Sequence, residues 1–264
     1  MPGPLPAAAR RTRLATLVAE EGFVSVADAS DLFQVSEVTL RSDLQYLGRT
    51  GSVRRVHGGA MVVPGLVRES PIEATSELDA GLKRAIGRRA AALVRSGSSI
   101  LLDVGSTALA VATALVARLD LNDVTVITNG LSVALALEPA IPRFTVVVIG
   151  GTLRPLQHSL VDPLAGRALA GLHADLAILG CNGVDDEGHV TNINLPEAEV
   201  KRDMIAASTA RILVADASKA GQRHLGLIGH LDDFGTLVTG GTGHERLAPV
   251  AAATQTDLEV VAAD

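Results

Sequence analysis

Five short segments rich in glycine and small polar residues each follow a run of apolar residues. The first reads Asp103-Val-Gly-Ser-Thr, and the others cover 128–130, 150–152, 180–183 and 216–219. Backbone N–H groups beside glycine and the hydroxyls of Ser and Thr bind phosphate, whereas carboxylates accept hydrogen bonds from sugar hydroxyls. One such loop is ordinary turn chemistry, but five together favour a binding site for a phosphorylated sugar or polyol.

Lysine is rare in this chain, which makes its positions informative. Of the 23 Lys and Arg residues only three are lysines, namely Lys83, Lys201 and Lys219. Lys201 and Lys219 lie beside the polar loops, where a compact ammonium group would meet phosphate. Glu197 lies four residues before Lys201 and three after Asn194, spacings that stabilise a helix and cap its start. Glu197 therefore has two candidate roles, one purely structural and one as a catalytic base.

The elements that position these loops form an α/β domain. Seven short apolar runs recur after residue 98, namely SILLD, VTVIT, FTVVVIG, DLAILG, RILVAD, TLVT and LEVV, several of them separated by alanine-rich stretches. Runs that are apolar at every position are typical of parallel strands buried on both faces, with helices as crossovers. Because ligands bind at the carboxyl ends of strands in such sheets, the five loops are expected to meet at one site.

The first sixty residues predict a winged helix-turn-helix. Helical spacing of apolar residues indicates a helix that ends at Gly22, a short helix over 26–33 capped by Ser25, and a third helix capped by Ser36. The segment SVRRVHGGA that follows Gly51 reads as a basic wing. This order of elements places the start of the last helix in the major groove of DNA, although a three-helix module that contacts only protein has the same pattern.

Charge and composition divide the chain and exclude several classes of protein. The net charge is −6, but residues 1–60 carry +1 and the remainder −7. We expect a DNA-binding domain over 1–60, a linker over 61–75 and an effector domain over 76–264. The longest uncharged runs have 14 residues, which is too short to span a membrane, so we expect a cytoplasmic protein. One cysteine excludes an internal disulfide, and we expect neither metal nor cofactor.

The N-terminal pattern resembles a known family. The stretch SVADASDLFQVSEVTLRSDLQYLGRTGSVRRVHGGA is similar to the N-terminal signature of the DeoR family of bacterial transcriptional regulators. It departs at Ser42, where the family usually has arginine, and at Gln34, where it usually has glycine. From pattern and resemblance together, the residues expected to contact duplex DNA are Ser36, Glu37, Val38, Thr39, Arg41, Ser42, Gln45, Arg54, Arg55 and His57.

The remainder resembles the sensor domain of the same family. The segments GCNGVDDEGHVTNINLPEAEVKRDM and LVADASKAG are similar to the regulator form of the sugar-phosphate-binding fold of ribose-5-phosphate isomerases. Val104 and Gly240 depart from the family pattern, which usually has a small polar residue and Asp there. The resemblance implies these effector-binding residues: Asp103, Gly105, Ser106, Thr107, Thr128, Asn129, Gly151, Arg154, Lys201, Asp216 and Lys219.

These observations leave two functions. The first is a DNA-binding regulator, a repressor of a carbohydrate operon, that responds to a phosphorylated sugar. The second is a sugar-phosphate isomerase with a carboxylate such as Glu197 as its base. The helix-turn-helix favours the regulator, because an isomerase has no use for it. Such modules read repeated half-sites, so we also expect a homo-oligomer, either a dimer or a tetramer.

Overall fold

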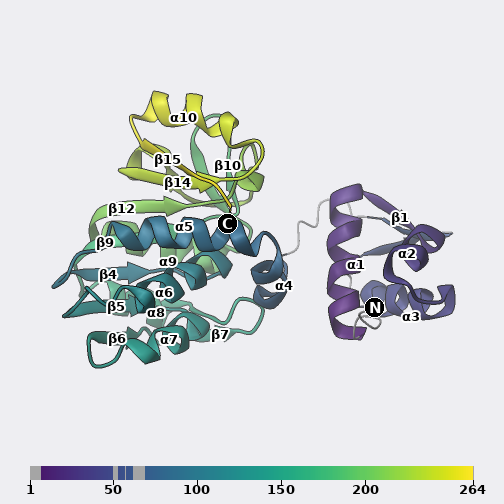
Figure 1. The fold of residues 1–264 in the computed structure, drawn as a ribbon, viewed down its shortest axis with the longest axis horizontal. Helices are drawn as coiled ribbons and strands as arrows, with labels where there is room; N and C mark the ends of the chain where they lie inside the picture. The colour runs from purple at the N-terminus through teal and green to yellow at the C-terminus, as the bar shows by residue number, and fades with distance from the viewer. Residues whose placement is uncertain (1–6, 50–52, 57, 62–68, 264) are drawn as a thin grey trace. The chain divides into compact units, whose positions relative to one another are not determined.

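The chain forms two compact units, which are described separately. The structure is a computed structural model that describes residues 7–49, 53–56, 58–61 and 69–263 (Figure 1). Unit 1 covers residues 1–74 and unit 2 covers residues 75–264. Within the described part of the chain, no helix has the length and apolar character needed to cross a membrane.

Unit 1 is a winged helix-turn-helix built on a small apolar core. Its elements in chain order are α1 (Ala7–Glu21), β1 (Phe23–Ser25), α2 (Val26–Phe33), α3 (Glu37–Arg49), β2 (Arg54–Val56) and β3 (Gly59–Met61). The three short strands pair antiparallel in the order β1-β3-β2. Leu14, Val18, Leu40, Leu44 and Leu47 are buried, as their helical spacing predicts.

The turn between α2 and α3 forms with the predicted caps. Asp28 N donates to Ser25 Oγ at 3.0 Å, and Thr39 N donates to Ser36 Oγ at 3.2 Å. Gln34 adopts the left-handed conformation at φ 54°, which costs a residue with a side chain about 1 kcal/mol. The turn therefore keeps its geometry without the glycine that the family usually has there.

A buried ion-pair cluster holds α3 against α1, and the sequence did not predict it. Asp43 is 1% exposed. Its carboxylate accepts hydrogen bonds from Arg10 Nε at 2.6 Å and from Arg11 Nε at 2.7 Å. Because both cations come from α1, this cluster fixes the helix that carries the predicted DNA-contacting residues.

Unit 2 is a parallel sheet with helices on both faces (Figure 1). The seven apolar runs are its seven strands, in the spatial order β15-β14-β12-β9-β4-β5-β6. The strands are β4 (Ser99–Leu102), β5 (Val124–Thr128), β6 (Phe144–Val148), β9 (Ala174–Gly180), β12 (Ser208–Val214), β14 (Thr236–Gly240) and β15 (Asp257–Val261). The helices are α4 (Ile72–Glu77, across the unit boundary), α5 (Ala80–Ala92), α6 (Ser106–Ala117), α7 (Leu131–Leu137), α8 (Pro163–Leu169), α9 (Leu195–Ala206) and α10 (Leu247–Thr254).

Successive residues of the central strands enter two different cores. On β4, Ile100 and Leu102 pack in the cluster that includes α5, α6 and α7, whereas Leu101 packs in the cluster that includes α8, α9 and α10. This alternation explains why the runs are apolar at every position. The connections from β4 lead one way to β5 and β6, and β9 begins the other half of the sheet. The order thus reverses between β4 and β9, where ligands bind in open parallel sheets.

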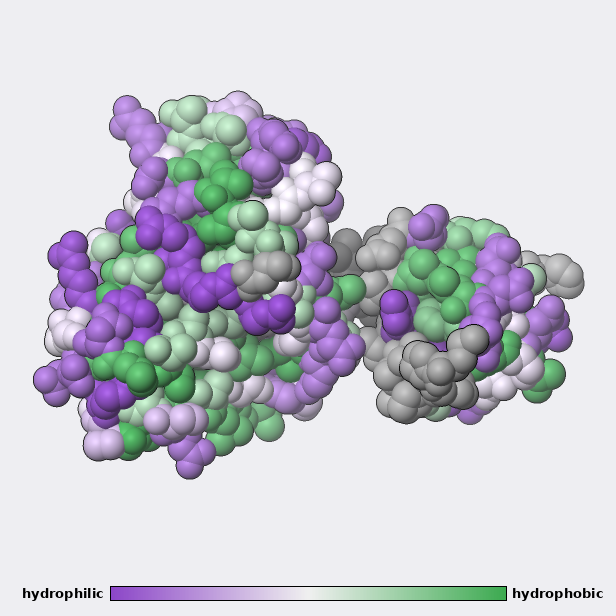
Figure 2. All heavy atoms as spheres, in the orientation of Figure 1, coloured by the Kyte–Doolittle hydropathy of each residue, from purple (hydrophilic) through white to green (hydrophobic). Residues whose placement is uncertain are grey.

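Several short strands form two smaller sheets outside the main one. They are the hairpin of β7 (Thr152–Arg154) and β8 (Ser159–Val161), and a small sheet of β10 (Gly183–Val184), β11 (His189–Asn192) and β13 (Gly226–His230). Figure 2 shows hydrophobic surface along the lower edge of unit 2, where Figure 1 places α7 and β7. Leu135 of α7 and Leu153 of β7 are among the exposed apolar residues.

Candidate functional site

A buried ion pair lies at the point where the strand order reverses. Asp103 directly follows β4, and its Oδ2 accepts hydrogen bonds from Gly180 N at the end of β9 at 2.8 Å and from Lys201 Nζ of α9 at 2.6 Å. Lys201 Nζ also donates to Gly180 O at 2.9 Å. Asp103 is fully buried and Lys201 is 4% exposed. The pair therefore joins two strands and a helix at the base of the predicted site.

The pKa values of both partners lie above their ordinary values. Burial raises the pKa of Asp103, and the Lys201 ammonium partly offsets this. Burial lowers the pKa of Lys201, but the Asp103 and Glu197 carboxylates outweigh it and hold that pKa above its ordinary value of 10.5. Lys201 therefore keeps its proton at neutral pH, and two of its three N–H groups are engaged within the protein. Its predicted contact with phosphate can use only the third.

Two buried oxygen atoms beside this pair have no hydrogen-bond partner among the described residues. They are Asp103 Oδ1 and Asn129 Oδ1, at the ends of the neighbouring strands β4 and β5. Asn129 is 1% exposed, and its Nδ2 donates to Leu160 O at 3.0 Å, which orients the amide. Buried acceptors without donors are costly unless a ligand supplies the hydrogen. Sugar hydroxyls are donors of this kind.

The amino end of α6 follows Asp103 directly. Gly105 has φ 97°, a conformation that favours glycine, and helix α6 begins at Ser106. Ser106 and Thr107 are partly exposed, and the first turn of a helix presents N–H groups that bind anions. Thr128 is buried, and its Oγ1 accepts from Gly130 N at 3.0 Å, so this hydroxyl shapes the adjacent loop.

A third group comes from the β7–β8 hairpin and α9. Arg154 pairs with Glu197 Oε1, to which Ser159 Oγ donates at 2.5 Å. Glu197 is 3% exposed and its N–H donates to Asn194 Oδ1 at 3.1 Å, as the predicted cap requires. Gly151 has a packing reason to be glycine, because a Cβ there would lie 2.4 Å from Val161 O. The carboxylate of Glu197 thus holds the hairpin on α9.

Lysine and aspartate also meet after β12. Asp216 is 5% exposed, and Lys219 Nζ lies 3.9 Å from its Oδ2. Burial raises the pKa of Asp216, but the Lys219 and Lys83 cations and the Ser218 hydrogen bonds hold it below its ordinary value. Lys219 is only partly buried, so its ammonium is accessible to a ligand.

Lys83 belongs to the same cluster, and sequence reasoning left it out. It is 7% exposed, and its Nζ donates to Thr75 O at 2.7 Å and to Leu78 O at 2.5 Å. Burial lowers its pKa, and the charges of Asp216 and Lys219 act on it. The rarity of lysine was the available signal, because all three lysines of the chain gather at this end of unit 2.

Several charged residues of these loops act electrostatically on the buried Cys181 thiol. Burial raises the pKa of the Cys181 thiol to about 12, and the charges of Lys201, Lys219, Asp216 and Asp103 all act on it. The loop after β5 also packs against the loop after β4, since a Cβ on Gly130 would lie 3.0 Å from Val104 Cγ1.

On unit 1, the predicted DNA-contacting residues of α3 share one face. Glu37, Val38, Arg41, Ser42 and Gln45 are all exposed. Ser36 is exposed and Thr39 is partly buried, while Arg54 and Arg55 are exposed on β2. Arg41 Nη2 donates to Glu37 Oε2 at 2.7 Å across the exposed helix surface. His57 lies outside the described residues.

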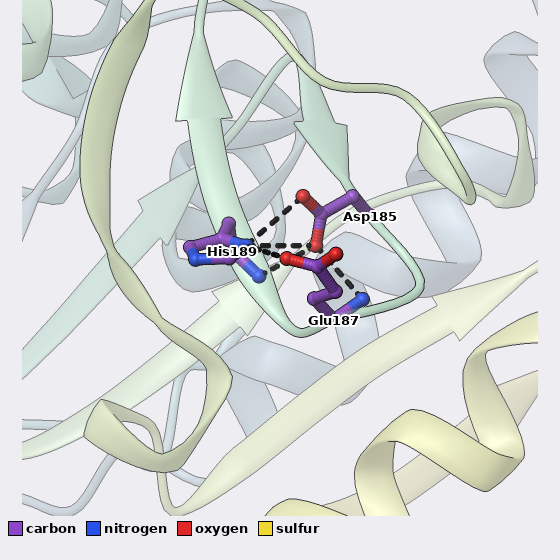
Figure 3. Close-up of side chains that lie close together, drawn as sticks. All are labelled: Asp185, Glu187 and His189. Carbon is purple, nitrogen blue, oxygen red and sulfur yellow. Dashed lines mark hydrogen bonds and ion pairs between the residues drawn. The ribbon is translucent and has the colours of Figure 1, made fainter.

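Three metal-ligating side chains meet at the β10–β11 turn (Figure 3). The ligand atoms of Asp185, Glu187 and His189 lie within 4.8 Å of one another. Asp185 Oδ1 already accepts from Glu187 N at 3.0 Å and from His189 N at 2.9 Å, and Arg223 Nη1 lies 3.1 Å from Asp185 Oδ2. The Arg223 guanidinium already pairs with two of these carboxylates, and the hydrogen bonds to Asp185 stabilise the hairpin turn.

Comparison with known proteins places both units in one family. Residues 10–64 match the model of the DeoR-like helix-turn-helix domain, and residues 79–241 match that of the DeoR C terminal sensor domain. The chain belongs to the DeoR family.

DeoR relatives span nearly the whole chain. The transcriptional repressor AccR of Agrobacterium fabrum is 32% identical and the glycerol-3-phosphate regulon repressor of Haemophilus influenzae is 30% identical. The first alignment covers 87% of this chain and 88% of the relative, and the second covers 88% of both. The chain is accordingly a transcriptional regulator and not an enzyme.

A solved ribose 5-phosphate isomerase from Plasmodium falciparum is a more distant structural neighbour. It aligns with a TM-score of 0.40 and 20% identity, over 54% of this chain and 53% of the isomerase.

Gly240 and Val104 depart from the DeoR sensor pattern, and the structure explains the departure at Gly240. A Cβ on Gly240 would lie 2.2 Å from Val261 O and 2.8 Å from Leu82 Cδ1. No side chain fits there, so the end of β14 contributes no carboxylate in this protein. Val104 is buried, and the structure gives no reason for its apolar character beyond that packing.

Proposed function

We propose that the protein is a repressor of a carbohydrate operon, in which unit 1 binds duplex DNA and unit 2 binds a phosphorylated sugar or polyol without converting it. DeoR family membership supports the regulatory role. A relative named for a glycerol-3-phosphate regulon supports a small phosphorylated polyol as the kind of effector. Engagement of Glu197 by Arg154 and Ser159 leaves it poorly suited to act as a base.

One observation carries the effector proposal. Among the described residues, Asp103 Oδ1 and Asn129 Oδ1 are buried acceptors without donors, and Asp103 lies three residues before the start of α6. The helix end suits a phosphate, and the two oxygens suit hydroxyls of the same molecule. Lys219 supplies an accessible ammonium after β12. The predicted effector contacts of the other loop residues remain part of this proposal.

A thermal-shift experiment tests it with named probes. Glycerol 3-phosphate and ribose 5-phosphate are compared with glycerol, ribose and inorganic phosphate, because a ligand that binds only the native state raises its stability. We expect a phosphorylated probe to raise the Tm more than its separate parts do. Asn129→Leu should remove that shift, and Asn122→Leu, at an exposed asparagine, should keep it. Turnover of ribose 5-phosphate at enzyme-like rates would overturn the proposal.

The assembly and the operator belong to the same proposal. Helix-turn-helix modules read half-sites one or two helical turns apart, so the operator should be repeated and the protein should be a dimer or tetramer in the cytoplasm. Light scattering of the protein–operator complex measures this directly. A single copy of the chain on its operator would contradict it.

A further inference from the structure

The positive charge of unit 1 is concentrated in one part of its sequence. Residues 1–60 contain seven arginines and six carboxylates, but Asp43 is the last carboxylate before Glu69. Arg49, Arg54 and Arg55 lie within this interval. The end of α3 and the strand β2 therefore form a region of uncompensated positive charge.

The other arginines of unit 1 are largely engaged elsewhere. Arg10 and Arg11 pair with buried Asp43 at 2.6 and 2.7 Å, and Arg41 pairs with Glu37 at 2.7 Å. Arg49 and Arg55, by contrast, form no ion pair with any carboxylate that the structure describes. Their guanidinium groups are exposed and available to an anion from outside the chain.

These arginines line a cleft between α3 and β2. The cleft has a volume of about 470 Å³ and is lined by Gln45, Gly48, Arg49, Val53, Arg54 and Arg55. Apart from Val53, every lining side chain larger than glycine carries hydrogen-bond donors. Donors in this number suit a phosphate group, which guanidinium binds with two parallel hydrogen bonds.

Gly48 has no backbone reason to be glycine. It lies within α3, where glycine is less favourable than alanine, and it does not adopt a positive φ. A Cβ at this position would lie 3.2 Å from Arg55 Cγ and 3.3 Å from Arg55 Cδ. The aliphatic part of Arg55 thus packs on Gly48, and a methyl group there would push it aside by a few tenths of an ångström.

We propose that this cleft binds one backbone phosphate of the operator, with Arg49 and Arg55 as its ligands and Gly48 as the residue that positions Arg55. The inference rests on the proposed DNA binding of unit 1 and adds two residues that the sequence did not select, Arg49 and Gly48. Gly48 lies seven residues after Arg41, which is about 10 Å along a helix. A helix that reads bases at its first turns therefore brings its last turn to the flanking sugar-phosphate backbone, since the major groove is about 12 Å wide.

The test uses the full chain and labelled duplexes, one carrying the operator and one of random sequence, over a series of salt concentrations. Arg49→Ala should weaken binding to both duplexes by about tenfold, or about 1.4 kcal/mol for one charge-assisted hydrogen bond. It should also reduce the slope of log affinity against log salt by about 1. Arg13→Ala removes the same charge from an exposed site on α1 and is the matched control.

Gly48→Ala separates this inference from a general loss of stability. Alanine favours the helix, so the Tm of unit 1 should stay the same or rise, while DNA affinity falls because Arg55 is displaced. If Arg13→Ala weakens binding as much as Arg49→Ala, the cleft is not a phosphate site. If Arg41→Ala weakens operator binding but Arg49→Ala and Gly48→Ala do not, the cleft is refuted and the DNA-binding function stands. If Arg41→Ala, Arg49→Ala and Gly48→Ala all bind both duplexes like wild type, DNA binding by this unit is itself refuted.

Discussion

Replacing Lys201 by methionine should strongly destabilise unit 2. The substitution keeps the length of the side chain but removes the cation that faces Asp103 at 2.6 Å. Asp103 is 0% exposed and would keep only backbone N–H groups, such as Gly180 N, as donors. Removing one partner of a buried ion pair costs about 3–5 kcal/mol, because the other charge stays buried and uncompensated. In a domain of this size each kcal/mol lowers the Tm by about 2–4 °C, so the expected fall is about 6–20 °C.

Calorimetry or circular dichroism measures this effect in a double-mutant cycle. Lys201→Met combined with Asp103→Asn removes both charges of the pair, so the double variant should recover part of the stability that Lys201→Met loses. Lys219→Met is the comparison, because a partly exposed pair at 3.9 Å contributes at most about 1 kcal/mol.

The pH dependence gives an independent check. The folded-state pKa of Lys201 lies above 10.5, so its contribution is complete below pH 10.5 and is lost as the pH rises through the folded-state value. Lys201→Met should lack that alkaline loss. A Tm change in Lys201→Met no larger than in Lys219→Met would refute a structural role for the Asp103–Lys201 pair.

Four further outcomes are expected. Lys219→Ala should abolish the influence of glycerol 3-phosphate on DNA affinity, while DNA binding in the absence of glycerol 3-phosphate stays intact. DNA titrations with and without glycerol 3-phosphate measure both, and an unchanged response would exclude this lysine from the phosphate site. Arg41→Ala should weaken operator binding more than random-duplex binding, and equal losses in gel retardation would contradict base reading. Gln34→Gly should stabilise unit 1 by up to about 1 kcal/mol in urea unfolding, because the φ of 54° at this position suits glycine. A lower free energy of unfolding in the variant would show that the Gln34 backbone is not strained. The Glu187 carbonyl raises the pKa of His230 from 6.5. The contribution of protonated His230 to stability is therefore complete below about pH 6.5 and is lost as the pH rises through the folded-state pKa. His230→Gln should flatten this pH dependence of the Tm in thermal melts from about pH 6 to 8.

The main sheet could be predicted because its strands are buried on both faces. Ile100 and Leu101 pack in different cores, so the strand appears in the sequence as an unbroken apolar run. The caps at Ser25 and Ser36 were equally readable, since capping is a local interaction. The strands β7, β8, β10, β11 and β13 were missed because each has only two to five residues, too few to show a pattern in the sequence.

The candidate site was predictable only at the level of single loops. Asp103 and Lys201 are 98 residues apart, and nothing local states that they bond to each other. Asp43 illustrates the same limit. An acidic residue on a helix is expected to be exposed, and only the packing of α1 places Arg10 and Arg11 against it. Long-range pairs of this kind depend on the packing of elements, which spacing alone does not specify.

Burial of the Asp103–Lys201 pair means that ionic strength should act unequally on the two activities of the chain. The Debye length falls from about 10 Å at 0.1 M salt to about 3 Å at 1 M, which weakens exposed charges and affects buried ones much less. Arg41, with 60% of its side chain exposed, belongs to the first kind, and Lys201, with 5%, to the second. Concentrated salt should therefore release the protein from DNA while the effector pocket stays assembled. Ligand affinity of the DNA-free protein can then be measured in the same sample, without truncating the chain.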